Sequence, residues 1–340
     1  MENPRNIIVI GASAGGQQAI VGIVKQLPAD INAAIFVVLH LSIKSNAQVI
    51  AKILQKNTSL NCTVATGGEE IKRSHLYLAP QNHHLLIKRN KIIIHHGARE
   101  NKYRPSIDVL FRSAAVNYGS RVIGIVLTGL FDDGTSGMSA IKRCGGICIV
   151  QDPGDADFSD MPQSVINHIE VDHKVKLSKM GDVLNAILNM PVPPGVRVPR
   201  ELLVENIITE NMITSISQLN EIGDRSKFIC PDCGGGLWAL NNDPANRYRC
   251  YTGHVYTEQG LYETQGLNLE ESVWVSIRML EERRNLLMLM ATNADRSGND
   301  DLAFSNRSRA DEMKLHIKRL KVLLSRLTED MEPRINVKEN

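Results

Sequence analysis

The chain has 340 residues and a nearly balanced charge, with 39 lysines and arginines against 37 aspartates and glutamates and a formal net charge of +2. This balance gives no electrostatic reason to expect nucleic acid or a membrane surface as a partner. The longest apolar run, residues 33–39, is far shorter than the ~20 residues that span a bilayer, and strand-like sequence begins at residue 7. We therefore predict a cytoplasmic protein with no signal peptide and no membrane insertion.

The first half of the chain alternates between strand and helix patterns. Apolar, β-branched runs at residues 7–10, 34–39, 122–127 and 147–150 are typical of buried parallel strands, and helical patterns lie at 17–26 and 136–142. This alternation predicts a doubly wound α/β domain over residues 1–190 with a mostly parallel sheet. Shorter strands at 76–79, 85–88 and 91–95, with a hairpin turn at 89–90, predict a small antiparallel insertion.

The second half changes character three times. Four prolines between residues 191 and 199 predict a semi-rigid linker, and with the connecting segment after it this part reaches residue 226. A cysteine-bearing module follows at 227–257. Two amphipathic stretches within 268–330, separated at 297–299, predict an α-helical hairpin. We expect its apolar stripes to pack on each other, while a dimer or partner contact through these helices stays open.

Ser13 lies in a turn of small residues directly after the first strand, in the sequence Gly-Ala-Ser-Ala-Gly. A dinucleotide site would have glycine in place of this serine and an acidic residue after the second strand, where the chain has His40. A phosphate loop would continue with Gly-Lys-Ser or Gly-Lys-Thr, which does not follow the turn. The pattern Gly-x-Ser-x-Gly instead favours a nucleophilic serine on a strand-to-helix turn.

A nucleophilic serine needs a base and an acid that orients the base. His40 ends the second parallel strand and is expected at the same edge of the sheet as Ser13, which makes it the candidate base. Asp132 and Asp133 follow the strand at 122–127, and either one fits the orienting role while the other caps the next helix. Serine, histidine and aspartate at three strand ends predict a hydrolase. Their order along the chain differs from that of the α/β-hydrolases.

Three of the six cysteines cluster in the module at 227–257. Cys230 and Cys233 have the Cys-x-x-Cys spacing of a zinc knuckle, and Cys250 with His254 follows after sixteen residues. Three thiolates and an imidazole predict a closed, tetrahedral structural zinc site. The basic residues around it are few and mixed with acids, so we expect no nucleic acid there.

Several separated motifs give the first ~190 residues a family resemblance. They are Gly11 to Gly16, Val38-Leu-His40, Tyr77-Leu-Ala-Pro80, Arg104-Pro-Ser-Ile-Asp-Val-Leu-Phe111, Leu127-Thr-Gly129, Asp133-Gly134 and Met161-Pro162. The chain resembles the catalytic domain of the bacterial chemotaxis protein-glutamate methylesterases. The resemblance implies Ser13 as nucleophile, His40 as general base and Asp133, the aspartate directly before the glycine, as the orienting residue. It also implies backbone oxyanion donors at Ala14 and Leu130.

The implied reaction is hydrolysis of glutamate γ-methyl esters on chemoreceptors or related signalling proteins, with release of methanol and no catalytic cofactor. Alternatives are a protein-glutamine deamidase with the same three residues and a non-catalytic binding module on this fold. Well-known members carry a phospho-receiver domain before the catalytic domain. Here the catalytic pattern starts at residue 7, and the segment 250–256 resembles the zinc ribbon of a stand-alone branch, so we expect regulation without a receiver.

Overall fold

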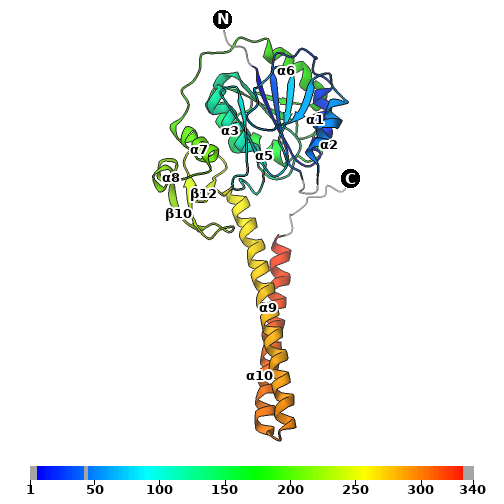
Figure 1. Ribbon diagram of the computed structural model, residues 1–340, viewed down its shortest axis with the longest axis vertical. Helices are drawn as coiled ribbons and strands as arrows, with labels where there is room; N and C mark the ends of the chain where they lie inside the picture. Colours follow the sequence, from blue (N-terminus) through cyan, green and yellow to red (C-terminus); the bar gives the residue numbers. More distant parts are fainter. Residues whose placement is uncertain (1–5, 42–44, 332–340) are drawn as a thin grey trace. The chain divides into compact units, whose positions relative to one another are not determined.

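The first half of the chain folds around a seven-stranded parallel sheet (Figure 1). The computed structural model describes residues 6–41 and 45–331 and divides into two compact units, Met1–Glu258 and Gln259–Asn340. In the first unit the strands lie in the order β3-β4-β2-β1-β7-β8-β9, and all neighbouring pairs are parallel. Their bounds are β1 (Ile7–Ala12), β2 (Ala34–Leu39), β3 (Asn61–Val64), β4 (His75–Leu78), β7 (Val122–Val126), β8 (Ile147–Gln151) and β9 (His173–Val175).

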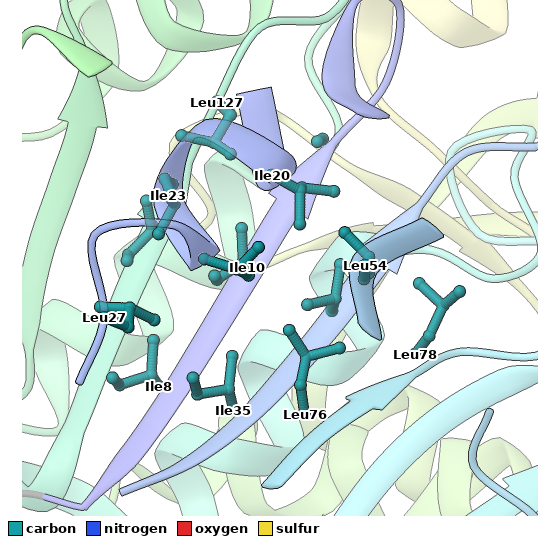
Figure 2. Close-up of a cluster of buried hydrophobic side chains, with 14 of the residues drawn as sticks. Ile8, Ile10, Ile20, Ile23, Leu27, Ile35, Leu54, Leu76, Leu78 and Leu127 are labelled. Atoms are coloured by element: carbon teal, nitrogen blue, oxygen red, sulfur yellow. The ribbon is translucent and has the colours of Figure 1, made fainter. Parts of the chain in front are cut away.

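Helices cover both faces of this sheet, which confirms the predicted doubly wound fold. On one face pack α1 (Gly16–Val24), α2 (Ala47–Gln55) and α6 (Met180–Leu188); on the other pack α3 (Ile107–Tyr118), α4 (Thr135–Arg143) and α5 (Asp160–His168). A short 3-10 turn, η1 (Gly119–Arg121), follows α3, and another, η2 (Leu177–Lys179), precedes α6. Figure 2 shows the first face, where Ile20 and Ile23 of α1 pack over Ile8 and Ile10 of β1. Because alternate residues of a strand face opposite layers, β1 is apolar along its whole length.

The prediction for residues 76–79 is wrong in its pairing. β4 lies between β2 and β3 and is parallel to both, so it belongs to the main sheet and not to an antiparallel insertion. A four-residue apolar strand does not reveal its partner, which is why the sequence left this open to error. The insertion is confined to β5 (His84–Lys88) and β6 (Lys91–His95). Their turn at Arg89 and Asn90 has the positive φ values, 39° and 66°, of a two-residue hairpin.

After the sheet, the first unit continues with two helices and a small antiparallel sheet. α7 (Arg200–Asn211) packs against α3, and α8 (Ile216–Ile222) follows within the stretch predicted as linker and connecting segment. The small sheet, called the ribbon below, consists of β10 (Gly223–Ile229), β11 (Gly236–Leu240), β12 (Tyr248–Cys250) and β13 (Val255–Tyr256). The ribbon carries the three clustered cysteines.

The second unit is the expected pair of long helices, α9 (Glu258–Arg296) and α10 (Asp300–Met331). Val273 and Ile277 of α9 are buried against Ile317 and Leu324 of α10. The 3-4 spacing of these side chains places them on one face of each helix, so the stripes read from the sequence form the contact between the two helices. Among the described helices, none combines the length and the apolarity needed to cross a membrane.

Candidate active site

The predicted triad residues all follow carboxyl ends of adjacent parallel strands. β2 and β7 pair with β1 on opposite sides, with Leu39 beside Ala12 and Val126 beside Gly11. The strand order therefore changes direction at β1, and open α/β sheets form their sites at such points. Ser13 follows β1, His40 follows β2 and Asp133 lies in the loop after β7.

Ser13 occupies a tight turn that only small residues permit. Its N–H donates to the carbonyl of Thr128 (3.0 Å), which links the turn to the loop after β7. Gly15 caps α1 in the left-handed region with φ of 73°, and a Cβ on Gly16 would lie 2.6 Å from the Cβ of Ala12. Glycine avoids both conflicts. The side chain of Ser13 is half-buried and makes no hydrogen bond with another described residue, so its hydroxyl is available.

Three contacts fix the position of His40: a backbone hydrogen bond, stacking of its ring and a hydrogen bond at one ring nitrogen. Its N–H donates to the carbonyl of Ala12 (3.0 Å), the residue before Ser13. Nε2 lies 2.9 Å from Asp133 Oδ2, and the ring stacks on Tyr103 with centroids 3.6 Å apart and planes 9° from parallel. Nδ1 is buried and, within the described residues, has no hydrogen-bond partner. An aspartate on Nε2 fixes the tautomer that leaves Nδ1 unprotonated.

Asp133 is buried in a ring of donors. Its Oδ2 accepts from the N–H of Ile107 (2.7 Å) as well as from His40, and its Oδ1 accepts from Ser106 Oγ (3.0 Å) and Asn101 Nδ2 (3.0 Å). Burial alone would raise the pKa of Asp133, but hydrogen bonds from His40, Ile107 and Asn101 hold it below its usual value. The carboxylate therefore stays charged beside the imidazole.

Asp133 does not cap the helix that follows it. Gly134 is the N-cap of α4 with φ of 100°, and the N–H of Thr135 donates to the backbone carbonyl of Asp132. The two aspartates thus have different environments: Asp132 is half-buried, whereas Asp133 is 1% exposed and bound to His40.

Two residues near this site, Asn101 and Tyr103, were not predicted from the sequence, whereas a third, Asp108, lies in the motif from Arg104 to Phe111. Asn101 and Tyr103 contact the triad residues, and Asp108 accepts from Asn101 Nδ2 at 2.7 Å. Burial and the negative charge of Asp133 raise the pKa of Asp108 to about 8. These residues come from the irregular stretch before α3 and its first turn, where no periodicity marks a functional side chain. For Asn101 and Tyr103, the signal that the sequence offered was their closeness to the motif that begins at Arg104.

The two predicted oxyanion donors come from two different turns, the one that carries Ser13 and the loop after β7. Ala14 is the residue after Ser13, and Leu130 lies two residues beyond Thr128, with its side chain 38% exposed. In the described part of the chain, neither backbone N–H donates to a protein acceptor. Backbone N–H groups without a protein acceptor are the kind of donor that an oxyanion requires.

The four predicted metal ligands lie together in the ribbon. Their ligand atoms are all within 4.8 Å of one another. Cys233 Sγ lies 3.7 Å from Cys250 Sγ, and His254 Nδ1 lies 3.7 Å from Cys230 Sγ and 3.6 Å from Cys250 Sγ. Tetrahedral zinc with ordinary bond lengths separates two sulfurs by about 3.8 Å and a sulfur from a nitrogen by about 3.6 Å. The donor set and its spacing fit a zinc ion, and the cysteines form no disulfide.

Comparisons with known proteins match the first half of the chain. The family model described as CheB methylesterase matches residues 8–184. A relative from Leptospira interrogans, named "Putative protein-glutamate methylesterase/protein-glutamine glutaminase", is 40% identical over 177 residues, which cover 52% of this chain and 91% of the relative. A Methanosarcina acetivorans protein named protein-glutamate methylesterase/protein-glutamine glutaminase 2 is 37% identical, and the match covers 54% of each chain.

The fold agrees with a solved structure from the same group. The crystal structure of the Thermotoga maritima CheB methylesterase catalytic domain aligns with a TM-score of 0.51 and 32% identity, covering 53% of this chain and 96% of that one. The family match ends at residue 184, so α7, the ribbon and the helical pair lie beyond it. With more than half of its residues matched by the family model, this chain belongs to the CheB methylesterase family.

Proposed function

We propose that this protein is a serine hydrolase that removes methyl groups from glutamate γ-methyl esters of chemoreceptor-like signalling proteins and releases methanol. The observation that carries the proposal is the pair of His40 and Asp133, whose Nε2 and Oδ2 atoms lie 2.9 Å apart at the edge of the sheet where Ser13 follows β1. Membership of the CheB methylesterase family supports the same reaction, as do the names of the relatives.

In the proposed acylation, Ser13 Oγ attacks the ester carbonyl while His40 Nδ1 takes the hydroxyl proton. Nδ1 suits this role because Asp133 holds Nε2 and no described residue bonds Nδ1. The imidazolium formed is stabilised by the charged carboxylate of Asp133. His40 then gives its proton to the departing methoxide, which leaves as methanol and completes the acyl-enzyme.

Deacylation repeats these steps with water. His40 deprotonates a water molecule, which attacks the acyl-enzyme carbonyl, and the proton returns to Ser13 as the glutamate is released. The N–H groups of Ala14 and Leu130 are the proposed donors to the oxyanion of both tetrahedral intermediates. Every proton in this scheme moves between groups of the chain, substrate and water, so the proposal includes no catalytic cofactor.

The decisive experiment measures methanol released from methylated receptor preparations together with labelling by a serine-directed fluorophosphonate. We expect Ser13→Ala to abolish both signals. Ser178→Ala is the matched control, because Ser178 is exposed and lies outside the proposed site. Equal methanol release by Ser13→Ala and the wild type would contradict the proposal. A wild type that neither labels nor releases methanol would favour a binding module on this fold.

A second reaction, deamidation of protein glutamine, is the alternative that the names of the relatives support. The same acyl-enzyme forms when ammonia leaves in place of methanol, and His40 protonates either leaving group. Mass spectrometry of a receptor substrate separates the two, because deamidation adds about one mass unit to a glutamine whereas demethylation removes a methyl group from an ester.

We also propose that Cys230, Cys233, Cys250 and His254 bind a structural zinc ion. All four positions are filled by protein side chains, which leaves no open position for a reactant. Thiols kept free for a metal fit a reducing compartment, and the proposal therefore places the protein in the cytoplasm.

The division of the chain into parts remains a proposal. We assign residues 1–190 to the esterase, 191–226 to the linker and connecting segment, 227–257 to the zinc module and 268–330 to the helical hairpin. The helical hairpin is the proposed contact for a partner or a second copy.

A further inference from the structure

The backbone beside one metal ligand pairs with the segment that carries Asn101. Val255 directly follows the ligand His254. Its N–H donates to the carbonyl of Arg99 (3.2 Å), and its carbonyl accepts from the N–H of Asn101 (2.8 Å). Residues 99–101 thus add to the edge of the ribbon at β13. They pair there with Val255, which is next in sequence to a metal ligand.

A buried cluster of charged side chains binds the same segment through Glu100. Glu100, which is 1% exposed, accepts from Arg112 of α3 (2.9 Å) and from Arg249 of β12 (3.0 Å). Burial alone would raise the pKa of Glu100, but the guanidinium groups of Arg112 and Arg249 hold it below its usual value. Arg249 directly precedes the ligand Cys250. A buried charge requires its partners, so Glu100 ties the segment to the ribbon.

Asn101 links this segment to the catalytic site through its side chain. Its φ of 52° lies in the left-handed region, which asparagine adopts at little cost, and its side chain is 5% exposed. Nδ2 donates one N–H to Asp108 Oδ2 (2.7 Å) and the other to Asp133 Oδ1 (3.0 Å). The amide therefore lies between two buried carboxyl groups and keeps them apart.

We propose that Asn101 is a positioning residue that keeps Asp133 oriented toward His40, and that the metal-loaded ribbon holds Asn101 in place. Occupancy of the metal site then sets how fast Ser13 is acylated, although the metal lies outside the reaction. This inference rests on the proposed function, because it assumes that Ser13 is acylated.

Loss of the metal acts through the hairpin between β12 and β13. Without a common centre, Cys250 and His254 no longer hold the turn between them, and the hydrogen bonds of Val255 to residues 99–101 weaken. Asn101 then leaves its place between the carboxyl groups. The free energy of a hydrogen bond to a charged group corresponds to a change in rate of about tenfold or more. We therefore expect loss of the metal to slow the acylation of Ser13 about tenfold.

The first test measures the rate at which a fluorophosphonate labels Ser13 in the zinc-loaded full chain, with kcat and KM for methyl ester hydrolysis. Asn101→Gly removes the amide and tolerates the left-handed backbone. We expect labelling and kcat to fall about tenfold while KM is unchanged. The control is Asn246→Gly, an exposed ribbon residue with φ of 48°, expected to label at the wild-type rate. Wild-type labelling by Asn101→Gly overturns the proposal.

The second test removes the metal with a chelator and restores it with Zn²⁺. Removal should slow labelling of the wild type about tenfold, and Zn²⁺ should restore it. In Asn101→Gly the same removal should change the rate less than twofold, because the group through which the metal acts is already absent. A further tenfold loss in this variant, or a wild type indifferent to the metal, contradicts the proposal.

Circular dichroism reports whether the metal-free chain stays folded. If it does not, Glu100→Gln replaces chelation, because it weakens the ion pairs to the ribbon with the metal in place. As a single substitution, Glu100→Gln should slow the labelling of Ser13, and in the Asn101→Gly background it should cause no further decrease. If the two substitutions instead lower the labelling rate by the product of their separate effects, the inference is overturned. Failure of the proposed function gives a different result, since the zinc-loaded wild type would then not label at Ser13.

Discussion

Replacing Asp133 with asparagine keeps the shape of the side chain and exchanges one oxygen for an NH2 group. With the NH2 at the Oδ2 position, it faces the N–H of Ile107 (2.7 Å) and His40 Nε2 (2.9 Å in the wild type). The opposite orientation is worse, because Oδ1 accepts from Asn101, Ser106 and two backbone N–H groups. The Asp133→Asn variant would therefore leave the N–H of Ile107 without an acceptor.

This exchange affects catalysis and stability by different amounts. An NH2 group donating to Nε2 drives the imidazole proton to Nδ1, where it blocks the proton transfer from Ser13. The corresponding exchange in serine proteases lowers kcat about 10⁴-fold, and we expect a loss of that order. The orphaned N–H costs about 1–3 kcal/mol, which lowers Tm by about 2–4 °C per kcal/mol in a unit of this size.

Methanol release measures the loss of kcat, and thermal unfolding measures the loss of stability. Asp132→Asn is the matched control, because it makes the same chemical change at the neighbouring aspartate, whose carboxylate is not the one that holds His40 Nε2, and it should retain wild-type kcat. Retention of more than about a tenth of the wild-type kcat by Asp133→Asn would refute the reasoning, because it would mean that the base does not depend on this carboxylate.

Three further predictions test the surroundings of the site and the second unit. Gly129→Ala should slow fluorophosphonate labelling, because its Cβ would lie 2.7 Å from that of Ser13, whereas Gly195→Ala, with no atom within 4 Å of its Cβ, should not. The raised pKa of Asp108, about 8 against 3.8, means that the folded protein keeps a proton that the unfolded chain has lost between these pH values. Stability therefore falls as pH rises through this window, by at most about 1.4 kcal/mol per unit, and urea unfolding of Asp108→Asn should show a smaller decline. Ile277→Ala should destabilise the α9–α10 pair by about 2–4 kcal/mol in thermal unfolding while labelling is unchanged; a change in labelling would contradict this.

The parallel strands were predictable because burial on both faces demands continuous apolar residues. β1, β2, β7 and β8 all show such runs, and their ends agree with the structure within two residues. β4 was assigned to the wrong sheet for the opposite reason. Its partner is decided by how the chain crosses over between strands, and four residues carry no information on that path.

The candidate site was predictable to the extent that strand order determines it. Ser13, His40 and Asp133 each follow a strand, and parallel strands place their carboxyl ends at one edge. The contacts of Tyr103 and Asn101 come instead from an irregular segment in which Asn101 and Lys102 have positive φ. No periodicity exposes such residues, and Asn101 meets Asp133 across 32 positions of sequence.

The buried charges explain why the ribbon belongs to the same compact unit as the sheet. Glu100 and Arg112 are nearly inaccessible to solvent although both are charged. Such a pair is tolerated only when further partners satisfy it, and these come from Glu205 of α7 and from Arg249 of the ribbon. Without the ribbon and α7, the pair would face solvent with its network incomplete. The same residues that make the ribbon part of the unit lie beside Asn101, so stability of the interface and orientation of Asp133 depend on one set of contacts.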